Sequence, residues 1–589
     1  MNTSQYVLQT CLTAILSLGL LFACQSGPGL SGAKPGTAAS SNPDSDFDQD
    51  LSKVGGIYAG KNLSGKNFSG QSLRYIDFSK SVLTRANFSG ADLTGSHFTE
   101  ALMAEADLSN AQLTDAVMTN AVLTNAKLTG ANVKGGNFTG VNLTAVKGSN
   151  GSVNDFSNFD FSNAIFTSGN LSNANLTNAK LSNTTLTGTK VTGSNFTGVN
   201  LTTVKGSNGS VNDFSNFDFS NAFFTNANLT NANLSNATLT GAKLTGANLT
   251  GVNLTAAKGS NGSVNDFSNF DFNSANLSNA NLTGTNLTDV KLSNATLKGT
   301  KVSGANLTRV NLAAVKGTTA IYSGNTLVLV VDFSSFDFSN ANLTNANLSG
   351  SIMKATTLTG AKITGANLTG VDLTTIKGSN GITNDFSGFD FSSVNLSNAI
   401  LVDTNLSNVN LTNANLTNAR LARVSVSPLN INQPCTNLTN ANLSNATLTN
   451  AALMEPKLFL LNTLPADWTC VNLTGVDLTT VKGTNGLVNN FENFDFSRVN
   501  LNHANLKAAN LKTSNLSFAN LSFANLSNAN LSYANWHYAN LSNADLRYAN
   551  VSFIELMHTA NLSGANVSPV ICDAGADTNW LCLKPSTQS

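Results

Sequence analysis

Hydrophobic residues near the C-terminus recur every five positions. From Asn515 to Asn550 the chain reads Asn-Leu-Ser-Phe-Ala, Asn-Leu-Ser-Phe-Ala, Asn-Leu-Ser-Asn-Ala and onward, with a leucine in each unit at Leu516, Leu521, Leu526 and Leu531. In an α-helix the fifth residue is rotated by about 140°, so these leucines would spiral over the whole surface. In a flat strand they would alternate between the two faces, because five is odd. The pattern therefore predicts neither element.

The pattern fits a chain that turns a corner once per five residues, always in the same sense. Each central leucine then faces inward, as does the small residue two positions earlier, such as Ala519 before Leu521. The small residue is needed because a narrow four-walled tube cannot hold two large side chains per wall at native packing density. Similarity at a fixed period is typical of a solenoid whose coils stack through backbone hydrogen bonds.

These units resemble the pentapeptide-repeat family, whose pattern is Ala, then Asn or Asp, then Leu or Phe, then any two residues. The resemblance runs, with interruptions, from about residue 61 to residue 567. It implies an all-β fold, a right-handed quadrilateral parallel β-helix (a pentapeptide-repeat solenoid) with four units per coil and, in this chain, Gly/Asn-rich loop insertions. The resemblance implies little about function.

A second repeated segment interrupts the five-residue period. Residues 147–156 recur almost verbatim at 205–214 and 258–267, and degenerate copies begin at Lys316, Lys377 and Lys482. The inward residues on either side, such as Leu143 and Phe156, are thirteen apart instead of five, which leaves eight extra residues. We expect a loop at one corner of the tube, and we expect successive loops to project from similar faces.

The chain resumes after each loop with an unusual set of aromatic residues. Phe159, Phe217 and Phe270 occupy the normally small inward position, so the coil must open locally to hold three rings. The copy at Lys316 is longer than the others. Within it, residues 326–331 predict a strand that is added to the edge of the tube or packed on it.

The N-terminal residues have the pattern of a targeting segment. Leu12 to Ala23 is an apolar run of signal-peptide length, too short to span a membrane alone. It ends in Leu21-Phe22-Ala23-Cys24, which resembles a bacterial lipobox and implies a lipid on Cys24. Plain secretion and a retained anchor are the alternatives. We expect an extracytoplasmic protein of the bacterial cell envelope, an outer-membrane lipoprotein attached to the membrane through its N-terminal lipid.

These patterns divide the chain into four parts. We expect a signal peptide with a lipobox at 1–24, a flexible tether rich in Gly, Ser, Pro and Asp at 25–56, a solenoid at 57–568 and a C-terminal cap at 569–589. A cap is expected because an uncovered coil exposes an edge that templates aggregation. The solenoid should be interrupted near 144–155, 202–213, 255–266, 313–332, 374–385, 427–437, 454–472 and 479–490.

Charge and cysteine usage limit the partners and the compartment. Charged residues make up 11% of the chain and balance to a net charge of +0, so neither a basic surface for nucleic acid nor an acidic surface that imitates it is expected. Cysteines other than Cys11 and Cys24 fall in two local pairs where the repeat fails, which favours the disulfides Cys435–Cys470 and Cys572–Cys582 in an oxidising space. A metal site at these cysteines is the alternative.

The chain offers little for catalysis. Its four histidines, His97, His503, His537 and His558, have no catalytic or metal spacing, so we expect no catalytic residue, no metal site and no cofactor. A β-helix enzyme that acts on polysaccharide is the alternative. Aspartate pairs beside the loops, such as Asp155 and Asp160, could ligate Ca²⁺, but closure of a turn by an Asx side chain is the preferred interpretation.

Aromatic residues gather at the corners of the last block. These positions carry Asn or Gly in most earlier units, and here they carry Phe518, Phe523, Tyr533, Tyr538, Tyr548 and Phe553. With twenty residues per coil, Phe518 should stack on Tyr538, and Tyr533 on Phe553. Exposed aromatic columns suit docking of a glycan or a protein partner, while mutual stabilisation of the rings near the cap is the simpler alternative.

The sequence therefore predicts a non-enzymatic surface or periplasmic lipoprotein whose solenoid acts as a structural scaffold or as a binding and adhesion module. Two further alternatives involve other surfaces. The Thr/Ser row after each inward residue, as at Thr230 and Ser235, resembles ice-binding solenoids. Some pentapeptide-repeat proteins act as DNA mimics, a role that needs the acidic surface this chain lacks.

Overall fold

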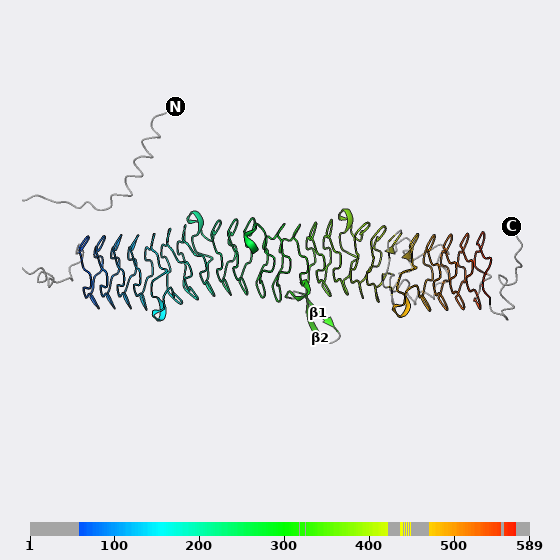
Figure 1. Ribbon diagram of the computed structural model, residues 1–589, viewed down its shortest axis with the longest axis horizontal. Helices are drawn as coiled ribbons and strands as arrows, with labels where there is room; N and C mark the ends of the chain where they lie inside the picture. Colours follow the sequence, from blue (N-terminus) through cyan, green and yellow to red (C-terminus); the bar gives the residue numbers. More distant parts are fainter. Residues whose placement is uncertain are drawn as a thin grey trace, which may run out of the picture. The chain divides into compact units, whose positions relative to one another are not determined.

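The computed structural model describes most of the solenoid (Figure 1). The described residues are 58–316, 319–323, 326–421, 436–439, 471–554 and 559–572, together with Ala441, Leu443, Ala446 and Leu448. They lie within one compact unit of the chain, Ser52–Ser589. The expected signal peptide and tether lie outside the described residues. Among the described residues, no helix is long and apolar enough to cross a membrane.

Each coil contains four five-residue units. The residue before each central inward residue forms a parallel β-bridge to the residue twenty positions later, as Asn62 does with Val82 and Val82 with Leu102. The N–H of Leu63 donates to the carbonyl of Val82 at 2.7 Å. Stacked coils therefore form four parallel walls, and the prediction of an all-β, four-sided parallel β-helix is confirmed.

The corners are β-turns that select particular residues. The N–H of Lys66 donates to the carbonyl of Leu63 at 3.2 Å, and the third turn residue, Gly65, has a left-handed φ of 66°. Gly and Asn tolerate this conformation, which explains their frequency there. The Asn62 side chain accepts a hydrogen bond from the Ser64 N–H at 3.1 Å, which explains the Asn or Asp before each inward residue.

The interior is filled by the predicted ladder. Leu516, Leu521 and Leu526 are fully buried, and the small residues Ala519 and Ala524 are 1% exposed. Both inward positions are thus closed to solvent. The aromatic residues after the loops are inside as well, because Phe159 and Phe217 are 7% exposed and Phe270 is 6% exposed. Phe159 packs against Phe156 with ring centroids 5.6 Å apart and against Phe161 at 5.4 Å, so the three-ring coil is confirmed.

The loops shift the ladder by the expected eight residues. Across the first loop Asn137 bridges Ile165, a separation of 28 instead of twenty. Five of the loops contain one turn of 3₁₀ helix: η1 Ser149–Gly151, η2 Ser207–Gly209, η3 Ser260–Gly262, η5 Ser379–Gly381 and η7 Thr484–Gly486. A further 3₁₀ turn, η4 Leu312–Ala314, precedes the longer copy.

The loops do not share a face, contrary to the expectation. Following the bridges from the first coil, Lys147 lies on the wall of Asn67, and Lys205 lies on the wall of Asp77. Figure 1 shows the first loop, in cyan, and the second, in blue-green, on opposite sides of the stack. Residues inserted in a loop lie outside the walls, so they do not carry the chain from one wall of the tube to the next. Lys205 comes 58 residues after Lys147, and eight of these residues are inserted in the loop. The other fifty lie in the walls and make two and a half coils, which places the second loop on the opposite side of the tube.

The longer copy forms a hairpin outside the tube. Strand β1, Thr319–Ser323, pairs antiparallel with β2, Thr326–Val330. Figure 1 shows this hairpin projecting from the stack of coils. A strand was expected at 326–331, and β2 confirms it, but its partner is β1 and not the edge of the tube.

The ladder continues across the least regular region and past the expected start of the cap. Strands β3, Thr436–Asn437, and β4, Val471–Asn472, pair in parallel. At the end, Asn550 bridges Ile571, so regular stacking extends beyond the expected boundary at residue 568. The rest of the expected cap lies outside the described residues.

Candidate functional site

The six aromatic residues of the C-terminal corners all stand at the left-handed turn position. We call Phe518, Phe523, Tyr533, Tyr538, Tyr548 and Phe553 the corner aromatics; their φ angles lie between 54° and 61°. The turn forces each side chain outward, away from the leucine ladder. Tyr538 is 56% exposed and Tyr548 is 55% exposed, while Phe518 is half-buried.

The predicted contacts between successive coils are present. The rings of Tyr533 and Phe553 are stacked, with centroids 4.9 Å apart and planes 10° apart. Those of Phe518 and Tyr538 lie 5.3 Å apart and are tilted by 36°. No ring contact involves Tyr548 among the described residues. The expected stacking is therefore present for Tyr533 and Phe553, whereas Phe518 and Tyr538 are in contact but tilted. The role of the rings is a separate question.

Three neighbouring side chains extend these columns and were missed from the sequence. His503 stacks on Phe523, with centroids 4.9 Å apart. The guanidinium of Arg498 lies 4.4 Å from the ring centroid of Phe518, and burial lowers the pKa of Arg498 below its ordinary value. His537 lies beside Tyr538, with centroids 4.2 Å apart. Residues 498 and 503 occupy the same turn position as the corner aromatics, so the five-residue frame contained the signal that identifies them.

The walls beside the rings are polar, and they carry amide ladders as well as charged side chains such as the Arg547–Asp545 ion pair next to Tyr548. The Asn540 side chain donates to that of Asn520 at 3.2 Å, and Asn520 donates to Asn500 at 3.1 Å. These amides form a ladder along one wall. Rings at the corners and amides on the wall together offer apolar faces next to hydrogen-bonding groups.

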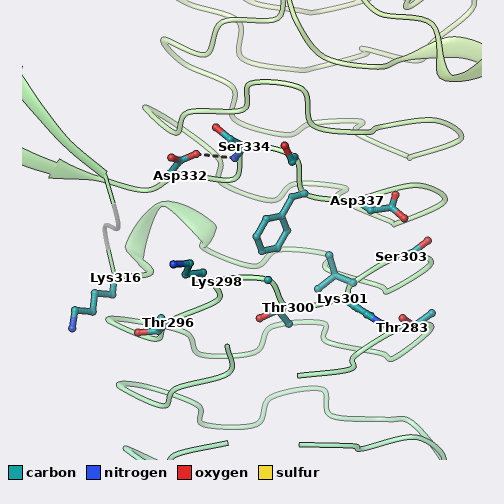
Figure 2. Close-up of a pocket in the computed structure, with 14 residues that line it drawn as sticks. Thr283, Thr296, Lys298, Thr300, Lys301, Ser303, Lys316, Asp332, Ser334 and Asp337 are labelled. Atoms are coloured by element: carbon teal, nitrogen blue, oxygen red, sulfur yellow. Dashed lines mark hydrogen bonds between the residues drawn. The ribbon is translucent and has the colours of Figure 1, made fainter. Parts of the chain in front are cut away.

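A separate recess lies at the base of the hairpin. Figure 2 shows it between two coils, with the Ser334 N–H donating to Asp332 at its upper edge at 2.8 Å. It measures about 1030 Å³, and Phe336, at 8% exposed, lines it. Three lysines and two aspartates stand around it: Lys298, Lys301, Lys316, Asp332 and Asp337.

An equivalent recess of about 390 Å³ at the second loop explains this opening. It is lined by Phe217 and Asp218. There the N–H of Val191 donates no backbone hydrogen bond among the described residues, whereas Val191 would normally bond to the next coil. The phenylalanine in the small position separates the two coils. We therefore interpret both recesses as consequences of packing three rings in one coil.

The aspartates beside the loops close turns and begin amide ladders. The Asp155 carboxylate accepts hydrogen bonds from the Ser157 N–H at 3.0 Å and from the Asn175 side chain at 2.9 Å. Asp213 accepts the same two kinds of bond from Ser215 and Asn233. These bonds are those expected of Asx side chains that close turns. Within the described ranges, no group of three or more His, Cys, Asp or Glu side chains is arranged to hold a metal ion.

The cysteine pairings stay predictions. Cys435, Cys470 and Cys582 lie outside the described residues, as do Cys24 and its expected lipid.

The chain matches one family over more than half of its length. The sequence model of the family described as "Pentapeptide repeats (8 copies)" matches residues 62–99, 106–144, 154–183, 170–203, 213–246, 271–309, 337–374, 390–427, 434–455, 495–532 and 524–568. A comparison with curated protein sequences gave no match.

The chain resembles several solved structures. QnrB1, a plasmid-mediated fluoroquinolone resistance protein, is 18% identical over 35% of this chain and 92% of its own, with a TM-score of 0.24. HetL, involved in heterocyst differentiation regulation in the cyanobacterium Nostoc, is 20% identical over 56% of this chain and 93% of its own, with a TM-score of 0.13. A pentapeptide repeat protein from the Arabidopsis thaliana thylakoid lumen is 34% identical over 24% of this chain and 69% of its own, with a TM-score of 0.10.

Proposed function

This chain belongs to the pentapeptide-repeat family, and we propose that it is a non-enzymatic scaffold of the bacterial cell envelope whose corner aromatics bind a ligand. A solenoid suits this role because every coil is hydrogen-bonded to its neighbours, which holds surface side chains in fixed positions. The observation that carries the proposal is the placement of six large aromatic residues at a turn position that favours Gly and Asn.

The corner aromatics contribute little net stability. A left-handed conformation costs about 1–2 kcal/mol for residues other than Gly and Asn. A pair of aromatic rings in contact returns about 0.5–1.5 kcal/mol, so each of the pairs Tyr533–Phe553 and Phe518–Tyr538 offsets roughly one of its two penalties. Tyr548 has no stacked partner among the described residues. Strained residues that are kept without a gain in stability are typical of functional surfaces.

The corner aromatics lie at all four corners of the tube, because they follow four different walls, those of Asn515, Asn520, Asn525 and Asn530. A glycan is the kind of ligand that such rings fit best. Sugars are bound by aromatic rings together with a small number of well-placed polar groups. The amide ladder of Asn500, Asn520 and Asn540 supplies such groups along the wall that leads to Phe523. A protein partner is the second candidate, because exposed tyrosines are also frequent at protein interfaces.

Substitution of three tyrosines by asparagine tests the binding role. Tyr533→Asn, Tyr538→Asn and Tyr548→Asn, combined in one variant, install the residue that the same turn position carries in other coils. Affinity electrophoresis through gels that contain envelope polysaccharides should show binding by the wild-type chain and a loss of about tenfold or more in the variant, since the exposed tyrosines are removed from three of the four corners.

Tyr75→Asn is the matched control. Tyr75 stands at the same turn position, with φ 58° and 56% exposure, but far from the C-terminal corners. Its substitution should leave retardation in the gel unchanged. Equal losses in the control and the triple variant, or full binding by the triple variant, would remove the corner aromatics from the site. Binding to a protein ligand but to no polysaccharide would favour the second candidate.

The proposed cellular location of the protein is inferred from its sequence. We propose that Cys24 carries the lipid, that residues 25–56 act as the tether, and that Cys435–Cys470 and Cys572–Cys582 form disulfides in an oxidising space. Mass spectrometry of the mature N-terminus tests the first point. An acylated Cys24 is expected, and a mature chain that starts elsewhere and carries no lipid would contradict it.

A further inference from the structure

The hairpin of β1 and β2 differs from the surfaces around it. Seven of its ten strand residues are apolar and none is charged. Five other copies of the segment hold a 3₁₀ turn at this place, with the sequence Ser-Asn-Gly or Thr-Asn-Gly. The fourth copy has therefore exchanged a short polar loop for an apolar pair of strands.

The hairpin is left with unpaired edges. Among the described residues it forms a two-stranded sheet, so the outer edge of each strand carries unpaired N–H and C=O groups. Figure 1 shows the hairpin projecting from the stack of coils. An isolated two-stranded hairpin is only marginally stable in water, and an apolar edge strand is a template for pairing with another chain.

We propose that this hairpin is a dimerisation element through which two copies of the chain pair their β2 strands antiparallel. Strand β2 is self-complementary about Val328. In that register Val328 lies opposite its own copy, Leu327 opposite Leu329, and Thr326 opposite Val330. Directly opposed residues share a face of an antiparallel sheet, so leucine pairs with leucine on one face, while the other face holds the central Val328 pair flanked by two pairs of Thr326 with Val330.

The pairing inside each hairpin extends the two faces. Leu327 and Leu329 lie opposite Tyr322 and Ala320, while Val328 lies opposite Ile321. The dimer would therefore contain a four-stranded sheet, a size at which sheets become independently stable. The contact is the same on both copies, so it closes on a two-fold axis and does not continue into a fibre.

A second copy fits better than a membrane. A transmembrane β-strand needs about 9–11 residues, and each strand of the hairpin has five. The strands carry no charge that would select a partner of opposite sign. An identical strand matches β2 in length, in apolar pattern and in register.

Replacement of the hairpin by a loop from the same chain tests the proposal. Lys316 and Asp332 correspond to Lys147 and Asp155 of the first copy, so residues 317–331 can be exchanged for the sequence of residues 148–154 without disturbing the register. Sedimentation velocity of the full chain should show a dimer, and the exchange should convert it to a monomer with an unchanged circular dichroism spectrum.

Two point variants refine the test. Val328→Lys places a charge at the centre of the paired strand and should weaken dimerisation at least tenfold. Val153→Lys is the matched control, because Val153 is exposed (54%) in the equivalent loop of the first copy, and it should leave the dimer intact. In Val328→Cys, the two substituted positions should cross-link across the axis, giving a peptide joined to its own copy at position 328.

Three results would overturn the proposal. The first is a wild-type chain that sediments as a monomer at all concentrations. The second is a dimer that persists after the hairpin is exchanged. The third is a dimer in which Val328→Cys forms no cross-link, which would exclude this register. None of these results affects the test of the corner aromatics, so the two proposals fail separately.

Discussion

Deletion of the first loop should reveal how the loop and the aromatic ring after it depend on each other. Removing residues 148–155 joins Lys147 to Phe156 and restores the five-residue frame. At present Lys147 bonds to the coil before it, through its N–H to Ala126, and Phe156 bonds to the coil after it, through its N–H to Asn175. A single wall can make both sets of bonds, as the unit of Asn87 and Phe88 does.

The cost should come from Phe159. With the loop present, the N–H of Val133 donates no backbone hydrogen bond among the described residues, so the next wall is held away from the preceding coil. Without the loop, the wall that carries Phe159 should move closer to the preceding coil, and the Phe159 ring then becomes too large for the small inward position. Overpacking of this kind costs about 1–3 kcal/mol. Phe159→Ala alone should cost about 3–5 kcal/mol through the cavity it leaves.

The two changes should compensate each other. In the deletion background, Phe159→Ala should be neutral or stabilising, which gives a coupling free energy of about 3 kcal/mol or more in a double-mutant cycle. Hydrogen exchange of the amides of residues 156–165 measures the local free energy of opening in each variant. Deletion of residues 148–154 alone is the frame control, and it should unfold the neighbouring coils. Additive effects of the deletion and Phe159→Ala would refute the reasoning.

Further predictions concern the ladder, the carboxylates and the turns. Leu521→Asp buries a charge in the interior and should unfold neighbouring coils, while Leu521→Ala should cost about 2–5 kcal/mol; a circular dichroism melting curve unchanged by Leu521→Asp would contradict the inward position. The Ser79 hydroxyl holds the pKa of Asp77 below its ordinary value, so the stability it contributes should be present above about pH 4 and be lost as the pH falls further. Urea unfolding should show this decline, and Asp77→Asn should make it smaller. Asn528→Gly changes one left-handed turn residue for another and should alter the melting temperature little, whereas Asn528→Val should lower it.

The five-residue period was enough to predict the interior and the stacking partners. Both follow from geometry alone, because four units close one coil and place each residue over the one twenty positions later. That rule predicted the contact between Tyr533 and Phe553. It also contained the contact of His503 with Phe523, which was missed because histidine was considered only as a catalytic or metal-binding residue.

The faces of the loops were predicted wrongly because the inserted residues were counted as part of the coil. Only residues that stay in the wall advance the chain around the axis. Between Lys205 and Lys258 there are 53 residues, of which eight are inserted, so the third loop is a quarter turn from the second. The pairing of β2 with β1 was not predicted for a different reason. The sequence of a strand indicates that it needs a partner strand, but it does not indicate which strand that is.

The role of the corner aromatics is tested most directly by the local stability of a variant in which all six are asparagine. Hydrogen exchange of the amides of residues 515–550 gives the free energy of opening of this block. If the rings are kept for contact with a ligand, the variant should stay within about 3 kcal/mol of the wild type, because relief of the left-handed strain offsets the lost stacking. A larger loss would show that the rings serve to stabilise the end of the solenoid, and it would contradict the proposed binding surface.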